Sequence, residues 1–83
     1  MPGKPTYTPA ELAYQIEIYL SRNPDAADTL EGVTRWWLQD LPGRICRQDV
    51  VTALKLLEDQ KEIRTYLVPG SNRIYENCNR IRH

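Results

Sequence analysis

Residues 47–76, RQDVVTALKLLEDQKEIRTYLVPGSNRIYE, carry the pattern that decides the predicted fold. Over residues 47–60 the apolar side chains recur with the period of an amphipathic helix. The side that we expect to be buried carries Val50, Val51, Ala53, Leu54 and Leu57. Polar residues occupy the opposite side, so this stretch predicts the most regular helix of the chain.

A β-hairpin is predicted directly after that helix. Residues 63–68 and 73–76 are rich in β-branched and aromatic residues, which favour strands, and the sequence PGSN at 69–72 favours a turn. A two-stranded hairpin is unstable alone in water, so we expect it to pack against the helices. Ile45, just before the helix, is a candidate for a short third strand at the edge of the hairpin.

Two more helices are predicted upstream. The sequence TPAE at 8–11 combines an N-cap threonine, a first-turn proline and a capping-box glutamate, and it starts a helix that ends near Arg22. Asp28 and Glu31 have the spacing of a second N-cap pair. We expect the second helix to be short and to end at the LPG sequence of residues 41–43.

The composition indicates one globular domain. The 83 residues are 41% hydrophobic and 27% charged, which is typical of a single folded domain. We expect this domain to span residues 8–78, with a flexible arm over 1–7 and a short basic tail over 79–83. No apolar run has the length of a membrane span and no signal peptide is evident, so we expect a cytoplasmic protein that does not contact membranes.

The charges are divided unevenly along the chain. The net charge is zero, but residues 1–43 hold three basic and six acidic residues, whereas residues 44–83 hold eight basic and five acidic residues. The C-terminal half therefore has a local basic excess, which attracts phosphate even when the whole chain is neutral.

The order of these elements resembles the winged helix-turn-helix superfamily. Residues 28–33 resemble its short second helix, residues 47–60 its recognition helix, and residues 61–75 its wing. The resemblance covers residues 8–78. It implies an α+β, mostly helical fold in which three helices precede a C-terminal β-hairpin wing.

This resemblance implies a small DNA-binding protein, a transcriptional regulator, that reads double-stranded DNA with its third helix. The implied DNA-binding residues are Gln48, Thr52 and Lys55 in the major groove, Arg44 and Arg47 on phosphates, and Arg64 and Arg73 in the wing. However, the third helix also carries three acidic residues, and a strong DNA binder is usually basic. A winged-helix adaptor that binds a protein and no DNA therefore remains the alternative.

Three side chains are candidates for a protein interface. Trp36 and Trp37 are adjacent, so they point in directions about 100° apart on a helix. Trp37 belongs to the core stripe, which leaves Trp36 either at the rim of the core or exposed as an anchor for a partner. Tyr14 and Ile18 lie off the main apolar stripe of the first helix. Either a homodimer forms through them, or the arm or the tail covers them.

No catalytic, metal or cofactor site is predicted. Cys46, Cys78 and His83 match no zinc-binding spacing, so we expect two reduced, free thiols. The sequence has no glycine-rich phosphate loop and no nucleophile motif, and its one histidine is the last residue. We therefore expect a protein that binds a partner, needs no cofactor and catalyses no reaction.

Overall fold

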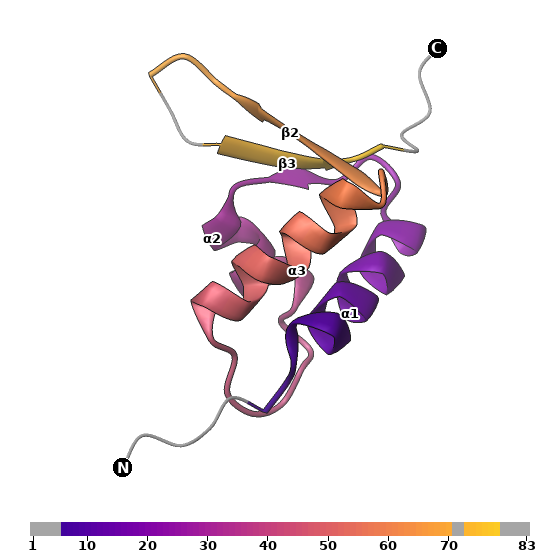
Figure 1. Cartoon of the computed structure of the whole chain (residues 1–83), viewed down its shortest axis with the longest axis vertical. Coiled ribbons are helices and arrows are strands. Elements are labelled where there is room, and N and C mark those ends of the chain that lie inside the picture. Colours follow the sequence, from indigo (N-terminus) through magenta and orange to yellow (C-terminus); the bar gives the residue numbers. More distant parts are fainter. Residues whose placement is uncertain (1–5, 71–72, 79–83) are drawn as a thin grey trace.

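The computed structural model describes residues 6–70 and 73–78. The elements are α1 (Pro9–Arg22), β1 (Ala27–Asp28), α2 (Leu30–Gly32), η1 (Val33–Trp37), α3 (Arg47–Asp59), β2 (Ile63–Leu67) and β3 (Arg73–Asn77). In this part of the chain α2 runs directly into η1, so three helical segments accompany a three-stranded antiparallel sheet. Figure 1 shows the helices on one side of that sheet, with α1 beside α3. The chain is thus a small α+β domain.

Helix α1 begins and ends as the sequence predicts. The Thr8 hydroxyl oxygen accepts the Glu11 backbone N–H at 3.2 Å, and the Glu11 carboxylate accepts the Thr8 N–H at 2.9 Å, which confirms the capping box. The helix ends at Arg22, because Asn23 leaves the helical conformation before Pro24. Its buried side consists of Leu12, Ala13, Ile16 and Leu20.

The second helical segment begins differently from the prediction. Its N-cap is Thr29, whose hydroxyl oxygen accepts the Gly32 N–H at 3.2 Å. Asp28 belongs to β1, and its carboxylate accepts the Thr29 N–H at 2.8 Å. The predicted cap pair of Asp28 and Glu31 is therefore wrong, because Asp28 is held in the sheet and the helix begins after Thr29.

This segment also ends earlier than the predicted end at residues 41–43. After a single α-helical turn it widens into the π-type turns of η1. The Thr34 hydroxyl donates to the Leu30 carbonyl at 2.8 Å, which is the carbonyl that the Thr34 N–H would use in a regular α-helix. Side-chain bonds of this kind bend helices. The wide turns place Trp37 in the core and leave Trp36 exposed.

The third strand of the sheet is β1 and not a segment at Ile45. β1 pairs with β3, with Ala27 opposite Glu76 and Asp28 opposite Tyr75, whereas Ile45 is half-buried in the loop before α3. A strand of two residues is too short to show an alternation of apolar and polar residues, so the sequence pattern could not predict it. The strand order is β1-β3-β2, which makes β3 the central strand and β2 an edge strand.

The core lies between α1, η1 and α3, and β2 closes it. The exposed fraction is 1% or less for Leu12, Ile16, Val33, Val50, Ala53, Leu54, Leu57 and Ile63. Tyr19 of α1 stacks on Trp37 of η1, with ring centroids 5.2 Å apart and ring planes 13° apart. The predicted buried side of the third helix is confirmed except at Val51, which is half-buried.

The loop before α3 is tied to the start of the described chain. The Thr6 N–H donates to the Arg44 carbonyl, and the Arg44 N–H donates to the Thr6 hydroxyl, both at 2.8 Å. The Tyr7 hydroxyl donates to the Pro42 carbonyl. Gly43 has a φ of +96°, and a Cβ there would lie 2.4 Å from the Thr6 hydroxyl oxygen, so both conformation and contact require glycine. Of the predicted arm, residues 6 and 7 thus pack on the domain, and residues 1–5 lie outside the described residues.

We expect the substitution Gly32→Ala to destabilise the domain. Alanine in place of a helical glycine ordinarily adds about 1 kcal/mol of stability. A Cβ at Gly32, however, would lie 1.9 Å from Oδ1 and 2.0 Å from Cγ of Asp28. Relieving this overlap should lower the free energy of unfolding by roughly 1–3 kcal/mol, which urea unfolding would measure.

The control for this prediction is the double variant Asp28→Ala, Gly32→Ala. It removes the obstructing carboxylate and should recover part of the lost stability. A Gly32→Ala protein as stable as the parent would show that the Asp28 carboxylate moves aside at no cost.

Candidate functional site

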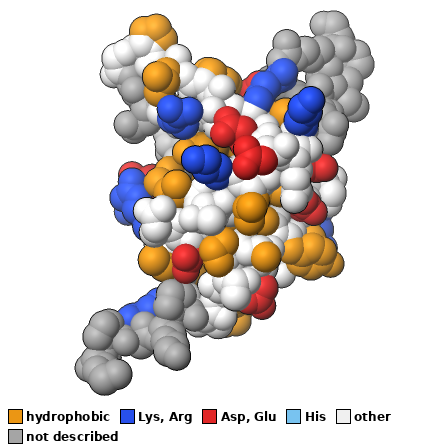
Figure 2. All heavy atoms as spheres, in the orientation of Figure 1, with side chains coloured by type: hydrophobic (Ala, Val, Ile, Leu, Met, Phe, Trp, Pro, Cys, Tyr) orange, Lys and Arg blue, Asp and Glu red, His pale blue; other side chains and the backbone are white. Residues whose placement is uncertain are grey.

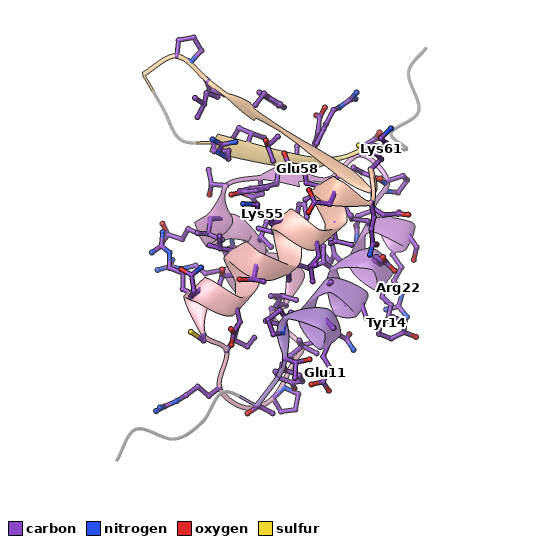
Figure 3. All side chains as sticks on the ribbon, in the orientation of Figure 1. Glu11, Tyr14, Arg22, Lys55, Glu58 and Lys61 are labelled. Atoms are coloured by element: carbon purple, nitrogen blue, oxygen red, sulfur yellow. The ribbon has the colours of Figure 1, made fainter. Side chains whose placement is uncertain are left out.

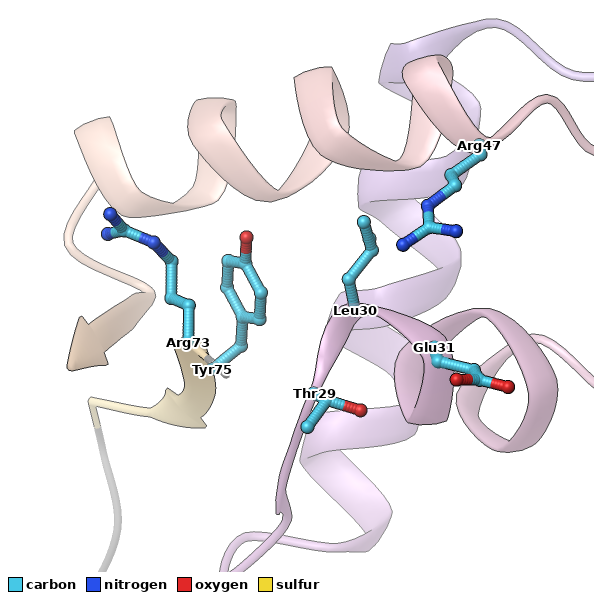
Figure 4. Close-up of a pocket in the computed structure, with 6 residues that line it drawn as sticks. All are labelled: Thr29, Leu30, Glu31, Arg47, Arg73 and Tyr75. Atoms are coloured by element: carbon cyan, nitrogen blue, oxygen red, sulfur yellow. The ribbon is translucent and has the colours of Figure 1, made fainter. Parts of the chain in front are cut away.

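A groove runs along the exposed side of α3, between this helix, α2 and β3. One cavity of about 240 Å³ lies at the start of α3 and is lined by Thr29, Leu30, Glu31, Arg47, Arg73 and Tyr75 (Figure 4). A second cavity of about 230 Å³ lies farther along the helix and is lined by Val51, Lys55, Glu58, Thr65, Arg73 and Tyr75. Arg73 and Tyr75 line both cavities, so the two adjoin each other. We call the two cavities together the α3–β3 groove.

Two periodicities place these side chains in the α3–β3 groove. Residues of a strand alternate between its faces, so Arg73 and Tyr75 share the face of β3 that lies toward α3. Residues three or four apart in a helix share a side, so Arg47, Val51 and Lys55 form one row on α3. In Figure 4 the guanidinium groups of Arg47 and Arg73 lie at the two ends of the first cavity, with Leu30 and the ring of Tyr75 between them.

The basic side chains of the groove outnumber its acidic ones. The basic residues are Arg47, Lys55 and Arg73, and the acidic residues are Glu31 and Glu58. The Glu31 carboxylate is paired with Arg35 at 3.2 Å on the helix surface. Among the described residues, the side chains of Arg47 and Lys55 make no ion pair or hydrogen bond, so their charges remain available to an anion.

Glu58 and Arg73 are joined through a threonine. The Thr65 hydroxyl donates to Oε2 of Glu58 at 2.8 Å, and it accepts an N–H of the Arg73 guanidinium at 3.1 Å. This chain of bonds holds the Arg73 side chain against the sheet and leaves its other N–H groups for a ligand. Figure 3 shows Lys55 and Glu58 on α3, next to the hairpin of β2 and β3.

Of the three predicted major-groove residues on α3, only Lys55 lines the α3–β3 groove. Gln48, Thr52 and Lys55 are all exposed on α3. The Thr52 hydroxyl donates to the Gln48 carbonyl of its own helix at 3.0 Å. Arg44 is exposed in the loop before α3 and does not line the groove.

The structure separates the two predicted wing arginines. Arg73 lines the α3–β3 groove, but Arg64 is opposite Glu76 in the β2–β3 register and belongs to the other face of the sheet. The Arg64 guanidinium is paired with the Glu76 carboxylate, and Glu76 is only 5% exposed. Arg64 is therefore not brought together with Arg47, Lys55 and Arg73.

Sequence reasoning assigned no binding role to seven of the ten residues that line the groove. They are Thr29, Leu30, Glu31, Val51, Glu58, Thr65 and Tyr75. The alternation of residues 73–76 already placed Tyr75 on the same face as Arg73, so that signal was present in the sequence. The approach of Thr65 to Glu58 depends on how the hairpin packs on α3, which no local pattern encodes.

The charges on this face are mixed. Figure 2 shows blue basic and red acidic side chains next to one another, with apolar side chains among them, rather than one continuous basic surface. An anionic partner would therefore meet a small number of available cations rather than a broad positive field.

The three candidate protein-contact residues are found in two places. Trp36 is 57% exposed, so of its two predicted positions the exposed one is observed. Tyr14 is 61% exposed on the outer side of α1 (Figure 3), where it shares a shallow cavity of about 310 Å³ with Tyr7. Ile18 is half-buried. The predicted cover by the tail falls outside the described residues.

The described residues offer no metal site and no membrane span. Cys46 and Cys78 are half-buried free thiols, and no group of three or more His, Cys, Asp or Glu residues in the described ranges is arranged to hold a metal ion. None of the described helices is long and apolar enough to cross a membrane.

Comparisons of the chain with protein-family models, with curated proteins and with solved structures found no match.

We expect Glu58→Gln to strengthen the binding of a polyanion such as heparin. Glutamine keeps an oxygen that accepts from Thr65 and removes the negative charge beside Lys55 and Arg73. A unit charge about 4 Å from an anion contributes about 1 kcal/mol in water, so elution from a heparin column should need more salt. The matched control is Glu17→Gln on α1, which removes the same charge away from the groove. Equal elution of the two variants would mean that the groove does not face the polyanion.

Proposed function

We propose that the chain is a winged helix-turn-helix domain that binds double-stranded DNA, with α3 as its recognition helix and the β2–β3 hairpin as its wing. The observation that carries this proposal is that Arg47 and Arg73, far apart in the sequence, line one groove along the exposed side of α3. Such a domain would act in the regulation of transcription.

The layout of the domain supports this proposal. Three helical segments precede the hairpin, and β1 joins that hairpin through β3. The last helix packs on α1 and buries Val50, Ala53, Leu54 and Leu57, so its polar side remains available to a partner. An exposed α-helix of this kind fits the major groove of B-form DNA.

Four side chains of α3 and β3 have chemistry that suits DNA. Arg47 is the first residue of α3, where the helix dipole and the free N–H groups also favour a phosphate. Arg73 places a second cation on the hairpin side of the groove. Gln48 can pair with the edge of adenine, and Lys55 can reach guanine or a phosphate. The arginines would set the position on DNA, and the helix residues would read bases.

The number of available cations sets the expected strength of binding. Arg47, Lys55 and Arg73 could neutralise about three phosphates, which gives a slope of roughly −3 for the logarithm of affinity against the logarithm of salt concentration. This is a shallow salt dependence for a DNA-binding protein. The neutral net charge of the chain agrees with weak non-specific binding, because no general positive field adds to these contacts.

Fluorescence anisotropy with a labelled mixed-sequence duplex, over a series of salt concentrations, tests the proposal. We expect Arg47→Ala and Arg73→Ala each to weaken binding and to reduce the magnitude of the salt slope by about 1. The matched control is Arg22→Ala, which removes an exposed arginine from the end of α1 (Figure 3). No binding by the parent protein at low salt, or equal losses in all three variants, would rule out the groove as a DNA interface.

One observation favours a second function, that of a protein-binding adaptor. Trp36 is 57% exposed on η1, and tryptophan is a frequent energetic anchor of protein interfaces. An adaptor should show no useful affinity for DNA. The substitution Trp36→Ala should weaken the binding of its protein partner while the helices stay folded. If a partner is retained equally by the Trp36→Ala protein, this residue is not its anchor.

A further inference from the structure

The edge strand β2 carries an apolar, exposed stretch to which the proposed function assigns no DNA contact. Tyr66, Leu67 and the following Val68 are 44%, 66% and 37% exposed. Within the described sheet β3 lies on one side of β2, and no strand lies on the other side. Figure 1 shows this hairpin reaching past the helices, so a partner can approach its edge.

One hydrogen bond determines which backbone groups face that edge. The Cys78 N–H donates to the Glu62 carbonyl at 3.0 Å, in register with the pairing of β2 and β3. In an antiparallel ladder, hydrogen-bonded and non-hydrogen-bonded pairs alternate. Counting from Glu62, the backbone groups of Arg64 and Tyr66 point to β3, and those of Thr65 and Leu67 point to the free edge.

The edge lacks the features that keep other strands away. Natural proteins protect sheet edges with charged side chains, prolines or bulges. The strand β2 contains one charged residue, Arg64, whose guanidinium is paired with Glu76 of β3. Pro69 comes only after the end of the strand. Two copies of this edge therefore bring no uncompensated like charges together.

We propose that a second copy of the chain pairs with β2, antiparallel, about a twofold axis at Thr65. In this register Thr65 lies opposite Thr65 of the second copy, Arg64 opposite its Tyr66, and Ile63 opposite its Leu67. All five residues of each strand are then paired. The backbone hydrogen bonds of the paired edges stabilise this contact, and the two guanidinium–aromatic pairs add to it. Ile63 is already buried in the core, and the Thr65 hydroxyl is already bonded to Glu58 and Arg73. A twofold contact of this type uses the same surface on both copies.

The pairing forms a small interface and hence a reversible dimer. Two strands of five residues with a short apolar tip bury less than the ~1,200 Å² of a standard protein interface. We therefore expect a dissociation constant in the micromolar range or weaker. The contact uses the backbone edge of β2, although the Thr65 hydroxyl also lines the α3–β3 groove. It needs no DNA, so it is measured on the protein alone and its failure leaves the proposed function untouched.

The first test is amide hydrogen exchange together with sedimentation velocity over a range of protein concentrations. We expect the sedimenting mass to rise toward that of a dimer. The exchange of the Thr65 and Leu67 amides should slow as the dimer forms, while the Arg64 and Tyr66 amides are protected at every concentration. A monomer up to millimolar concentration, or a dimer in which the Thr65 and Leu67 amides exchange as fast as before, overturns the proposal.

The second test compares two lysine substitutions. Leu67→Lys places a charge on the pairing edge and should raise the dissociation constant by about tenfold or more. Tyr14→Lys is the matched control, because Tyr14 is exposed to a similar degree on the outer side of α1. We expect it to leave the dimer unchanged. Loss of the dimer with Tyr14→Lys and its retention with Leu67→Lys would assign the contact to α1 and overturn the proposal.

Discussion

The central position of β3 is the constraint on which the other surfaces depend. This strand bonds to β1, which precedes the second helical segment, and to β2, which follows α3. It thereby fixes the hairpin over the helices and sets which side chains face α3. A slip of one residue would move every side chain to the other face of the sheet. If β3 slipped in this way, Arg73 and Tyr75 would leave the groove.

The groove shows how a neutral chain can still present selected charges. Acidic and basic residues are equal in number, yet salt bridges between some of them leave fewer charges available to a partner. Glu31 is occupied by Arg35, and Arg64 is occupied by Glu76. The charges that remain available along α3 are determined by these salt bridges and by the register of the sheet. Net charge alone would have described this surface poorly.

Local sequence patterns predicted the long elements well. The capping box of α1, the period of α3 and the alternation of the hairpin each involve neighbouring residues, and each was confirmed. The errors occurred where a distant contact overrides a local preference. Asp28 looks like an N-cap, but pairing with Tyr75 of β3 holds it in the sheet. Ile45 looks like a strand residue, but it lies in the loop before α3, and β1 is the third strand of the described sheet.

The candidate site was predicted in part for the same reason. The exposed row of α3 follows from helical period alone, so Gln48, Thr52 and Lys55 were found on the surface as expected. Separating Arg64 from Arg73 required the register of the hairpin relative to α3. The Glu58–Thr65–Arg73 chain of hydrogen bonds required its packing as well. Residues in three elements meet there, and their meeting is a property of the tertiary structure.

The hydrogen bonds between Thr6 and Arg44 have a practical consequence for labelling and fusion. They hold the described start of the chain against the loop that leads into α3. A fluorophore or protein joined ahead of Thr6 would thus be anchored near the first turn of that helix. A label joined after Cys78 would leave from the end of β3, on the sheet side of the domain (Figure 1). C-terminal attachment is therefore the better choice when the start of α3 must stay unobstructed.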